Sequence, residues 1–210
     1  MINKENGQNM TQWQKSDWRY ELVRRRASVS SEARLIAEKK SCKSLLSLLQ
    51  VMPPAAVFLY RSYGSEFPTY PMIEVFLEHS WTVLAPSGEG SKTSVDELIF
   101  YKSGDWQTAA SSEAEEMRQK TTVILLPGLG FDGWGNRLGR GGGYYDKVLS
   151  LFPTQALRLG VGFLCQCLGD GMRLPCESWD EPVHVVLTEN GFRGVDHVCG
   201  FWCEWKPETK

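Results

Sequence analysis

Short apolar segments that alternate with helical segments constrain the fold of this chain more than any other feature. The apolar segments are rich in Val, Leu and aromatic residues and lie at 55–60, 81–85, 98–101, 123–126, 157–161 and 183–187. They show little polar alternation, which is typical of strands buried on both faces. Between them lie helical segments at 71–79, 113–119 and 144–152. This order predicts an α/β fold with a mostly parallel sheet that helices cover on both sides.

Two further helices are predicted before the first strand. The first spans about 12–28 and has Trp18 and Leu22 on its apolar stripe. The second follows Ser30, a favourable N-cap, and ends before Pro53. Its apolar face is expected to comprise Leu35, Cys42, Leu45, Leu46 and Leu49.

Length and charge limit the class of protein. The chain has 210 residues, with 23 Lys and Arg against 25 Asp and Glu, and a formal net charge of −2. A general nucleic-acid-binding protein would need an excess of basic residues, so no nucleic-acid partner is expected. The longest apolar runs are far shorter than the roughly 18 residues of a membrane span. The N-terminal residues have no apolar core of the secretory type, so we expect a soluble, cytoplasmic protein without a membrane partner.

The domain organisation expected from these patterns is simple. Residues 1–10 are polar and without pattern, which predicts a disordered lead. Residues 11–195 are expected to form a single domain, and 196–210 form an aromatic C-terminal extension. The six cysteines, at 42, 165, 167, 176, 199 and 203, are interpreted as free thiols. Their spacing differs from that of common zinc sites, although metal binding stays an alternative.

The most informative segment is a glycine-rich loop that follows the expected strand at 123–126. It reads PGLGFDGWGNRLGRGGGYYD from Pro127 to Asp146. Glycines let backbone N–H groups converge on an anion, and the helix that begins at Tyr144 adds the positive end of its dipole. Arg137 and Arg140 supply formal charge beside it. The loop therefore predicts a phosphate-binding site.

Two alternatives to this interpretation remain open. The loop contains no G-x4-G-K-[S/T] motif, which excludes a P-loop. Gly128, Gly130 and Gly133 match the G-x-G-x-x-G pattern of nicotinamide or flavin sites, but more loop follows them instead of a helix. A long connection whose glycines serve only turns is the other alternative.

The segment LLPGLGFDGWGNRLGRGGGYYD strongly resembles the signature of the 5-formyltetrahydrofolate cyclo-ligase family, also called 5,10-methenyltetrahydrofolate synthetases. Weaker similarities are KSDWR at 15–19, YRSYGSE at 60–66, GVGFLCQ at 160–166 and LPCESWDEPVHVVLTE at 174–189. The resemblance implies a three-layer α/β/α sandwich with a Rossmann-like central sheet. It also implies an enzyme that cyclises 5-formyltetrahydrofolate to 5,10-methenyltetrahydrofolate and converts MgATP to ADP and phosphate. In that reaction the formyl oxygen attacks the γ-phosphate, N10 attacks the formyl carbon, and phosphate leaves.

The resemblance implies site residues as well. Those implied to bind ATP are Lys15, Arg19, Arg137, Leu138, Gly139, Arg140, Gly141, Gly142, Gly143, Tyr144 and Tyr145. Those expected to bind folate are Arg61, Glu66, Arg140, Gly141, Gly142, Gly143 and Tyr144. Arg137 and Arg140 are the expected catalytic groups, because an arginine can neutralise charge that develops on a transferring phosphoryl group. Asp146 is the implied ligand of Mg²⁺, which prefers carboxylate and phosphate oxygens.

The basic residues of the first helix share one face. At about 100° per residue, Arg19 lies about 40° and Arg26 about 20° from Lys15 around the helix axis. Such a face, next to the stripe that docks the helix, can hold phosphates over the glycine-rich loop. A solvated cationic face is the alternative for each residue taken alone.

The sequence departs from the family pattern near its last strand. His184 stands where many members carry an aspartate that is thought to help bind magnesium, and histidine is a poor ligand for that cation. Asp180 or Glu181 could substitute for that aspartate, but neither is two residues from His184 along the strand, the spacing that would place it on the same face. The stretch 104–120 also lacks a Gly-x-x-Glu-Pro sequence that many relatives have.

The sequence is therefore compatible with three functions. The leading prediction is an active cyclo-ligase that acts as a monomer on a folate and ATP. A catalytically weakened homologue that binds folate or nucleotide is the second. An α/β enzyme for another phosphorylated small molecule is the third.

Overall fold

One large sheet organises the chain. The computed structural model describes residues 10, 13–88 and 97–195. Within these residues the sheet has eight strands in the order β10-β9-β8-β5-β1-β2-β3-β4. Their bounds are β1 (Ala56–Phe58), β2 (Thr82–Pro86), β3 (Leu98–Lys102), β4 (Asp105–Thr108), β5 (Thr121–Pro127), β8 (Leu157–Val161), β9 (Val185–Thr188) and β10 (Gly191–Gly194). The expected N-terminal lead, apart from Met10, and the C-terminal extension lie outside the described residues.

The central strands of the sheet are parallel, as predicted. β9, β8, β5, β1 and β2 pair in parallel, with Val57 of β1 opposite Val83 of β2 and Val123 of β5. The edges differ, because β3, β4 and β10 pair antiparallel. β3 and β4 form a hairpin whose turn residues, Ser103 and Gly104, both have positive φ, as a tight two-residue turn requires.

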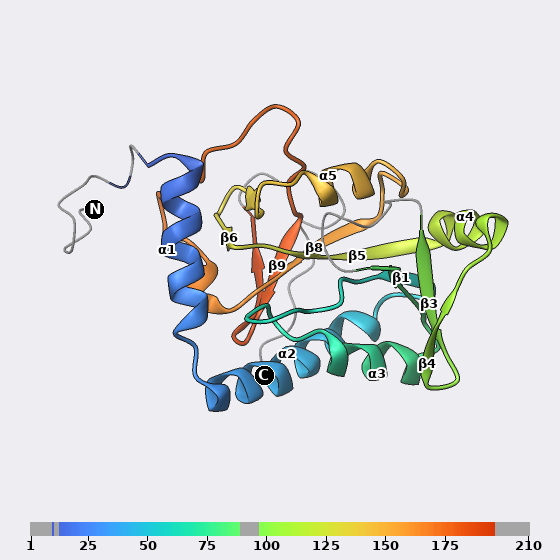
Figure 1. Cartoon of the computed structure of the whole chain (residues 1–210). Coiled ribbons are helices and arrows are strands. Elements are labelled where there is room, and N and C mark those ends of the chain that lie inside the picture. The colour runs from blue at the N-terminus through green and yellow to red at the C-terminus, as the bar shows by residue number, and fades with distance from the viewer. Residues whose placement is uncertain (1–9, 11–12, 89–96, 196–210) are drawn as a thin grey trace.

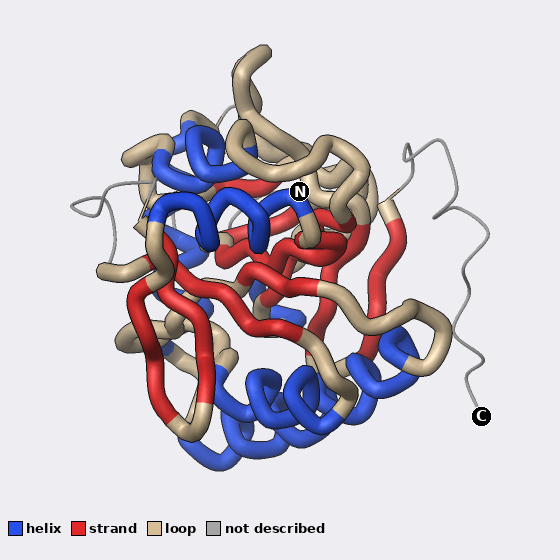
Figure 2. Tube along the Cα trace, turned by 90° about the vertical axis from the view of Figure 1, so that its right-hand side faces the viewer, coloured by secondary structure: helices blue, strands red, loops and turns tan. Residues whose placement is uncertain are grey.

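Helices cover both faces of the sheet and one end of it (Figures 1 and 2). The helices are α1 (Lys15–Ala27), α2 (Ser31–Leu49), α3 (Tyr70–Glu78), α4 (Ser111–Gln119) and α5 (Tyr144–Leu149). α2 and α3 lie on one face, whereas α4 and α5 lie on the other. α1 stands beside the end of the sheet to which β5 runs (Figure 1). The predicted three-layer α/β/α sandwich is therefore confirmed.

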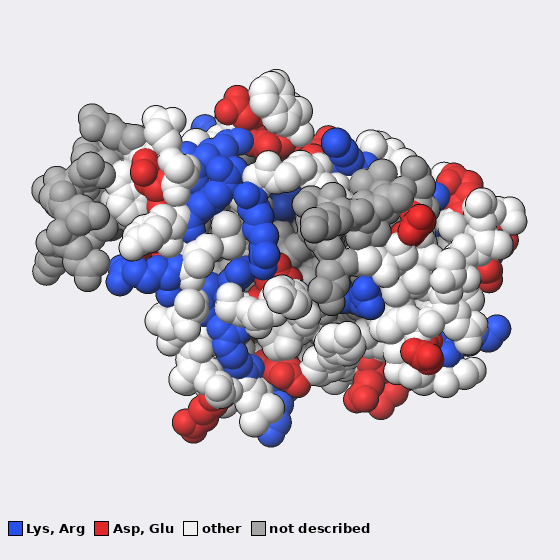
Figure 3. Space-filling model, viewed as in Figure 1, with Lys and Arg blue, Asp and Glu red and all other residues white. Residues whose placement is uncertain are grey.

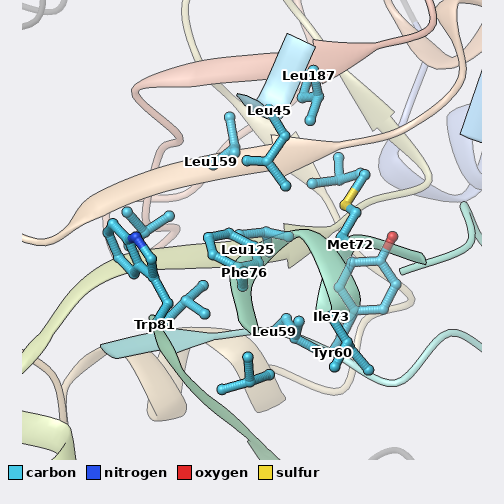
Figure 4. Packing of buried hydrophobic residues seen from close by; sticks show 14 of the residues in the cluster. Leu45, Leu59, Tyr60, Met72, Ile73, Phe76, Trp81, Leu125, Leu159 and Leu187 are labelled. Carbon is cyan, nitrogen blue, oxygen red and sulfur yellow. The ribbon is translucent and has the colours of Figure 1, made fainter. Parts of the chain in front are cut away.

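Successive side chains of β5 enter two separate cores because they alternate between the faces of the sheet. Val123 and Leu125 pack with α2 and α3, and Ile124 and Leu126 pack with α4 and α5. Figure 4 shows the first core, in which Leu45 of α2 lies over the sheet with the side chains of α3. Burial on both faces is the physical reason for the continuous apolar runs.

α2 differs in detail from the expected apolar face. Ser30 caps the helix as predicted, because its hydroxyl accepts a hydrogen bond from the Ala33 N–H. Leu45 and Leu49 are buried, but Leu35 is 51% exposed and Leu48 is buried although it was not predicted. At about 100° per residue, Leu45, Leu46, Leu48 and Leu49 spread over about 160° of the helix circumference, so their spacing does not show which edge of this arc faces the sheet.

A third apolar cluster docks α1 on the glycine-rich loop. Its buried members are Trp13, Trp18, Leu22, Leu129, Leu138, Leu168 and Leu174. The contact is close, because a Cβ on Gly130 would lie 2.5 Å from a methyl carbon of Leu22. Glycine at 130 is thus required for α1 to approach the loop. Within the described residues, no helix combines the length and apolar character that crossing a bilayer requires.

Replacing Leu22 by alanine tests this docking. Leu22 is completely buried, so we expect its truncation to lower the free energy of unfolding by about 3 kcal/mol. Urea denaturation measures the change. Val23→Ala is the matched control, since Val23 is 43% exposed on the same helix and its truncation is expected to cost less than about 0.5 kcal/mol. Equal losses in the two variants would contradict the docking role of Leu22.

Candidate active site

The predicted phosphate site lies at the carboxyl ends of the parallel strands, where ligands bind in sheets of this kind. After β5 the chain forms a small hairpin of β6 (Gly130–Phe131) and β7 (Arg137–Leu138). Residues 139–143 then lead to α5, and Gly143 adopts a left-handed conformation at its N-cap. Basic side chains gather in a band beside α1 on this side of the molecule (Figure 3).

Asp132 holds the turn of this hairpin and was not predicted. It is 5% exposed, and its carboxylate accepts hydrogen bonds from the backbone N–H groups of Trp134, Asn136 and Leu174, each at 2.9 Å. The bond from Leu174 ties the hairpin to the segment that precedes β9. One buried side chain therefore fixes two segments that surround the site.

Gln166 is a second unpredicted anchor. It is 1% exposed, and its Nε2 donates to the carbonyl oxygens of Gly128 and Leu129 at 2.7 and 3.1 Å. Its Oε1 accepts a hydrogen bond from the Phe163 N–H at 3.0 Å. The glycine-rich loop thus leaves β5 along a fixed path, as a preorganised binding loop must.

Arg19 joins the basic face of α1 to the loop. Its Nε donates to the Gly139 carbonyl at 3.0 Å. Gly141 has a φ of +102°, and a Cβ there would lie 3.2 Å from the Arg19 guanidinium. Both the backbone conformation and the close approach favour glycine at 141. The predicted meeting of α1 with the loop is therefore observed.

An ion pair brings Arg140 to Glu66, which lies 74 residues away in the sequence. The Arg140 Nη2 donates to the Glu66 Oε1 at 3.0 Å, and the other Glu66 oxygen accepts from the Tyr63 N–H at 3.1 Å. The Glu66 side chain is 15% exposed and that of Arg140 is 60% exposed. A residue expected to bind ATP thus contacts one expected to bind folate.

Tyrosines and a further arginine surround Glu66. Burial, with a smaller effect of the Glu66 carboxylate, raises the pKa values of Tyr60 and Tyr145 well above their ordinary value. Both therefore remain neutral. Arg26 is 4% exposed, and its Nε donates to the Ser65 hydroxyl at 3.1 Å. Burial lowers the pKa of Arg26, and the negative charge of Glu66 opposes this shift. Glu66 thus lies near two neutral phenols and the positive charge of Arg26 and Arg140.

Arg137 pairs with the expected metal ligand. Its Nη2 donates to the Asp146 Oδ1 at 2.9 Å, and its Nη1 donates to the Pro127 carbonyl at 3.3 Å. The guanidinium also lies 5.7 Å from the centre of the Tyr145 ring. The Arg137 side chain is 5% exposed, so these contacts hold its charge in a nearly buried position at the end of β5.

Lys15 contacts acidic residues that were not predicted to reach the site. Its Nζ lies 2.6 Å from the Asp180 Oδ2 and 3.9 Å from Glu177. Burial acts to raise the pKa of Asp180, but hydrogen bonds from Lys15 and the Glu177 N–H outweigh it and lower that pKa. The charge of Arg137 contributes in the same direction. Asp180 therefore belongs to the same cluster of charges.

The remaining predicted residues make different contacts. Arg61 donates from Nη2 to the Ser87 carbonyl at 3.2 Å, which directs it toward the end of β2. Leu138 is buried in the third cluster, and its carbonyl accepts a hydrogen bond from the Leu129 N–H at 2.7 Å. The rings of Tyr144 and Tyr145 meet edge to face, 5.1 Å apart. Gly142 and Gly143 are exposed on the loop.

The 5-formyltetrahydrofolate cyclo-ligase family model matches residues 11–189 of this chain. The chain belongs to this family. Curated relatives named 5-formyltetrahydrofolate cyclo-ligase include one from Haemophilus influenzae, 24% identical over 81% of this chain and 95% of the relative. Another, from Mus musculus, is 27% identical over 82% of this chain and 92% of the relative. The predicted family and enzyme class are confirmed.

Solved structures of 5,10-methenyltetrahydrofolate synthetases share the fold. The protein from Aquifex aeolicus matches with a TM-score of 0.64 and 26% identity, over 89% of this chain and 95% of that one. The protein from Mycoplasma pneumoniae has a TM-score of 0.64 and 21% identity, over 84% of this chain and 99% of that one. The arrangement of strands and helices is therefore that of cyclo-ligases.

His184, the departure from the family pattern, makes contacts away from the predicted metal ligand. Its Nδ1 accepts a hydrogen bond from the Arg158 N–H at 3.1 Å, and its own N–H donates to the Arg158 carbonyl. Burial, followed by the charge of Arg158, lowers the pKa of His184 below its ordinary value, although Glu181 opposes the shift. His184 thus pairs with Arg158 of β8 through both its ring and its backbone.

This arrangement predicts a pH dependence of stability. The unfolded chain binds a proton at His184 at a higher pH than the folded chain. The fold therefore loses stability as the pH falls below about 6.5, and the loss ends below the folded-state pKa. Urea denaturation between pH 7.5 and 5 should show a shallower loss for His184→Gln than for the unchanged chain. Equal slopes would contradict the effect of burial on His184.

The described cysteines are free thiols, as predicted. Burial raises the pKa of Cys42 and of Cys167 to about 11, which keeps these thiols protonated and makes them poor metal ligands. Among the residues that the structure describes, no three His, Cys, Asp or Glu side chains are grouped to hold a metal ion. Cys199 and Cys203 lie outside the described residues.

Proposed function

We propose that this chain converts 5-formyltetrahydrofolate to 5,10-methenyltetrahydrofolate and splits ATP to ADP and phosphate. The contact between Arg140 and Glu66 is the observation that supports this proposal most strongly. Phosphoryl transfer requires donor and acceptor to lie in contact. The Arg140 guanidinium suits a phosphate, and the Glu66 carboxylate suits the N–H groups of a pterin. Arg140 Nη2 and Glu66 Oε1 lie 3.0 Å apart. Family membership supplies the identity of the two substrates.

The side chains have distinct roles in the proposed reaction. Glu66 accepts hydrogen bonds from the pterin and thereby orients the formyl oxygen toward the γ-phosphate. That oxygen forms a bond to phosphorus while the bond to ADP breaks. Arg140 and Arg137 neutralise the charge that develops on the transferred group. N10 then attacks the formyl carbon, loses its proton, and phosphate leaves with the former formyl oxygen.

Lys15 and Arg19 are proposed to bind the rest of the triphosphate. They precede Arg26 along one face of α1, and Arg19 contacts the glycine-rich loop at the Gly139 carbonyl. Lys15 pairs with Asp180, and Arg140 pairs with Glu66. We propose that phosphate oxygens replace these carboxylates, which frees Glu66 for the folate.

Magnesium fits the site as part of MgATP. Asp146 offers a carboxylate at the start of α5, 24% exposed and next to Arg137. Mg²⁺ commonly takes one or two carboxylates together with substrate phosphates, so one such side chain is sufficient. When bound, the ion would neutralise part of the charge on the triphosphate. We propose Asp146 as its protein ligand.

The finer assignments are proposals as well. We propose that residues 11–195 form a single catalytic domain and that the chain works as a monomer. We also propose a cytoplasmic location and small molecules as partners; a net charge of −2 disfavours nucleic acid. Size-exclusion chromatography with light scattering tests the monomer, and a dimer at micromolar concentration would contradict it.

One assay tests the proposed reaction. The protein is mixed with 5-formyltetrahydrofolate and MgATP at mildly acidic pH, and the absorbance of the methenyl product is followed. We expect product formation that requires both substrates, with one ADP formed per product. Binding of folate without turnover would show a weakened binding protein instead. Absence of folate binding would indicate an enzyme for another phosphorylated molecule.

A further inference from the structure

α1 connects the folate end of the site to its opposite end. Arg26 lies beside Ser65 and the Glu66 carboxylate. At 1.5 Å per residue, Arg19 lies about 10 Å and Lys15 about 16 Å from Arg26 along the helix axis. Arg19 contacts the glycine-rich loop, and Lys15 contacts Asp180. The basic face thus extends from the pterin position toward the segment that precedes β9.

A tight turn lies at the Lys15 end of this face. The Asp180 N–H donates to the Glu177 carbonyl at 3.1 Å, and the Glu177 N–H donates to the Asp180 Oδ2 at 2.8 Å. The same Asp180 oxygen contacts Lys15. Figure 1 shows the segment, in orange, passing the amino-terminal end of α1. The turn is therefore fixed to α1 beside a residue expected to bind phosphate.

Trp179 lies within this turn and is exposed. Its exposed fraction is 69%, whereas Trp13, Trp18 and Trp81 are at most 8% exposed. Among the tryptophans that the structure describes, it is the one that the fold leaves exposed to solvent. Because the indole of Trp179 is exposed, it contributes little to the core, and its ring face can contact a ligand.

We propose that Trp179 is the surface on which the base of ATP stacks. The inference rests on the proposed function, in which the γ-phosphate lies at the Glu66 and Arg140 end. The nucleotide then extends along α1 past Arg19 toward Lys15, so the nucleoside lies beside the turn at 177–180. An aromatic ring there binds the planar base, and Lys15, which contacts Asp180 of the same turn, binds phosphate beside it.

Stacking predicts a particular specificity. Every base has an aromatic face, so a stacking contact discriminates weakly among nucleotides. We expect GTP to replace ATP as substrate, with a KM within about tenfold of the KM for ATP, because differences in stacking strength between bases correspond to that range. Inorganic tripolyphosphate carries the phosphates without a base, and its binding is therefore expected to be independent of Trp179.

The test compares ATP and inorganic tripolyphosphate as ligands of the unchanged chain and of three variants. Trp179→Ala is expected to raise the KM and Kd of ATP about tenfold, since this is the usual cost of losing one base stack. The kcat and the KM for 5-formyltetrahydrofolate should change less than about twofold, and Trp179→Phe should restore most of the ATP affinity. Tyr20→Ala is the matched control, because Tyr20 is an aromatic residue of α1 that is 76% exposed.

Calorimetry with inorganic tripolyphosphate decides the interpretation. The proposal expects the same tripolyphosphate Kd for Trp179→Ala and the unchanged chain, together with the weaker ATP binding. An unchanged Kd for ATP would overturn it, and so would an equal loss for tripolyphosphate, which would indicate a distorted phosphate site. Absence of cyclisation by the unchanged chain would overturn the proposed reaction, whereas these binding measurements would still test Trp179.

Discussion

Replacing Arg140 by alanine is expected to lower kcat for cyclisation by about 100-fold or more, which is the usual effect of removing a preorganised donor to developing charge. The Kd of 5-formyltetrahydrofolate should change less, because Glu66 and its tyrosine neighbours remain in place. Arg140 is 60% exposed, and without it Glu66 keeps the hydrogen bond from the Tyr63 N–H and the nearby charge of Arg26, so the fold should be retained. Single-turnover absorbance measures the rate, and calorimetry measures folate binding.

Arg24→Ala is the control for this experiment. Arg24 is 53% exposed on α1 and pairs with Glu21, about 180° around the helix from Lys15. Its removal changes the net charge by the same amount but should leave kcat within about twofold, since surface charges outside the site have small effects. If Arg140→Ala cyclises folate as fast as Arg24→Ala, Arg140 has no role at the phosphoryl group.

Asp146→Ala is expected to affect both stability and catalysis. It leaves the Arg137 guanidinium, which is 5% exposed, without its carboxylate partner. Removing one member of a buried pair costs about 3 kcal/mol of unfolding free energy. The same change removes the proposed protein ligand of Mg²⁺, so the rate should fall and its magnesium dependence should shift to higher concentration. Urea denaturation and a magnesium titration of the rate measure the two effects.

A double variant separates the structural effect from the catalytic one. Arg137→Met combined with Asp146→Ala removes both charges and fills much of the same volume, so the unfolding free energy should recover. The rate should stay low, because neither the arginine nor the carboxylate is present at the phosphates. Wild-type activity with an unchanged magnesium dependence in Asp146→Ala would remove Asp146 from the metal site.

The central sheet could be predicted from sequence because its strands are buried on both faces. The segment at 157–161, for example, coincides with the observed β8. The edge strands β4 and β10 have the sequences DWQT and GFRG, in which no apolar run marks a strand. Such strands form because neighbouring strands offer unpaired backbone groups, and that information lies outside their own sequence.

The site was predictable where its chemistry is local in sequence. The glycine-rich loop and the helical spacing of Lys15 and Arg19 can each be recognised within a single segment. Asp180 could not be placed, because it reaches Lys15 across 165 residues of sequence. Asp132 and Gln166 were missed for the same reason, since their function is to accept or donate hydrogen bonds in distant segments.

Transfer of the formyl oxygen to phosphate is the central claim, and an isotope label tests it most directly. 5-Formyltetrahydrofolate labelled with ¹⁸O at the formyl oxygen is cyclised with unlabelled ATP, and the released phosphate is analysed by ³¹P NMR. The proposed mechanism predicts one ¹⁸O atom in each phosphate formed with methenyl product. Phosphate that contains only unlabelled oxygen would show that ATP is hydrolysed by water, and it would contradict the account.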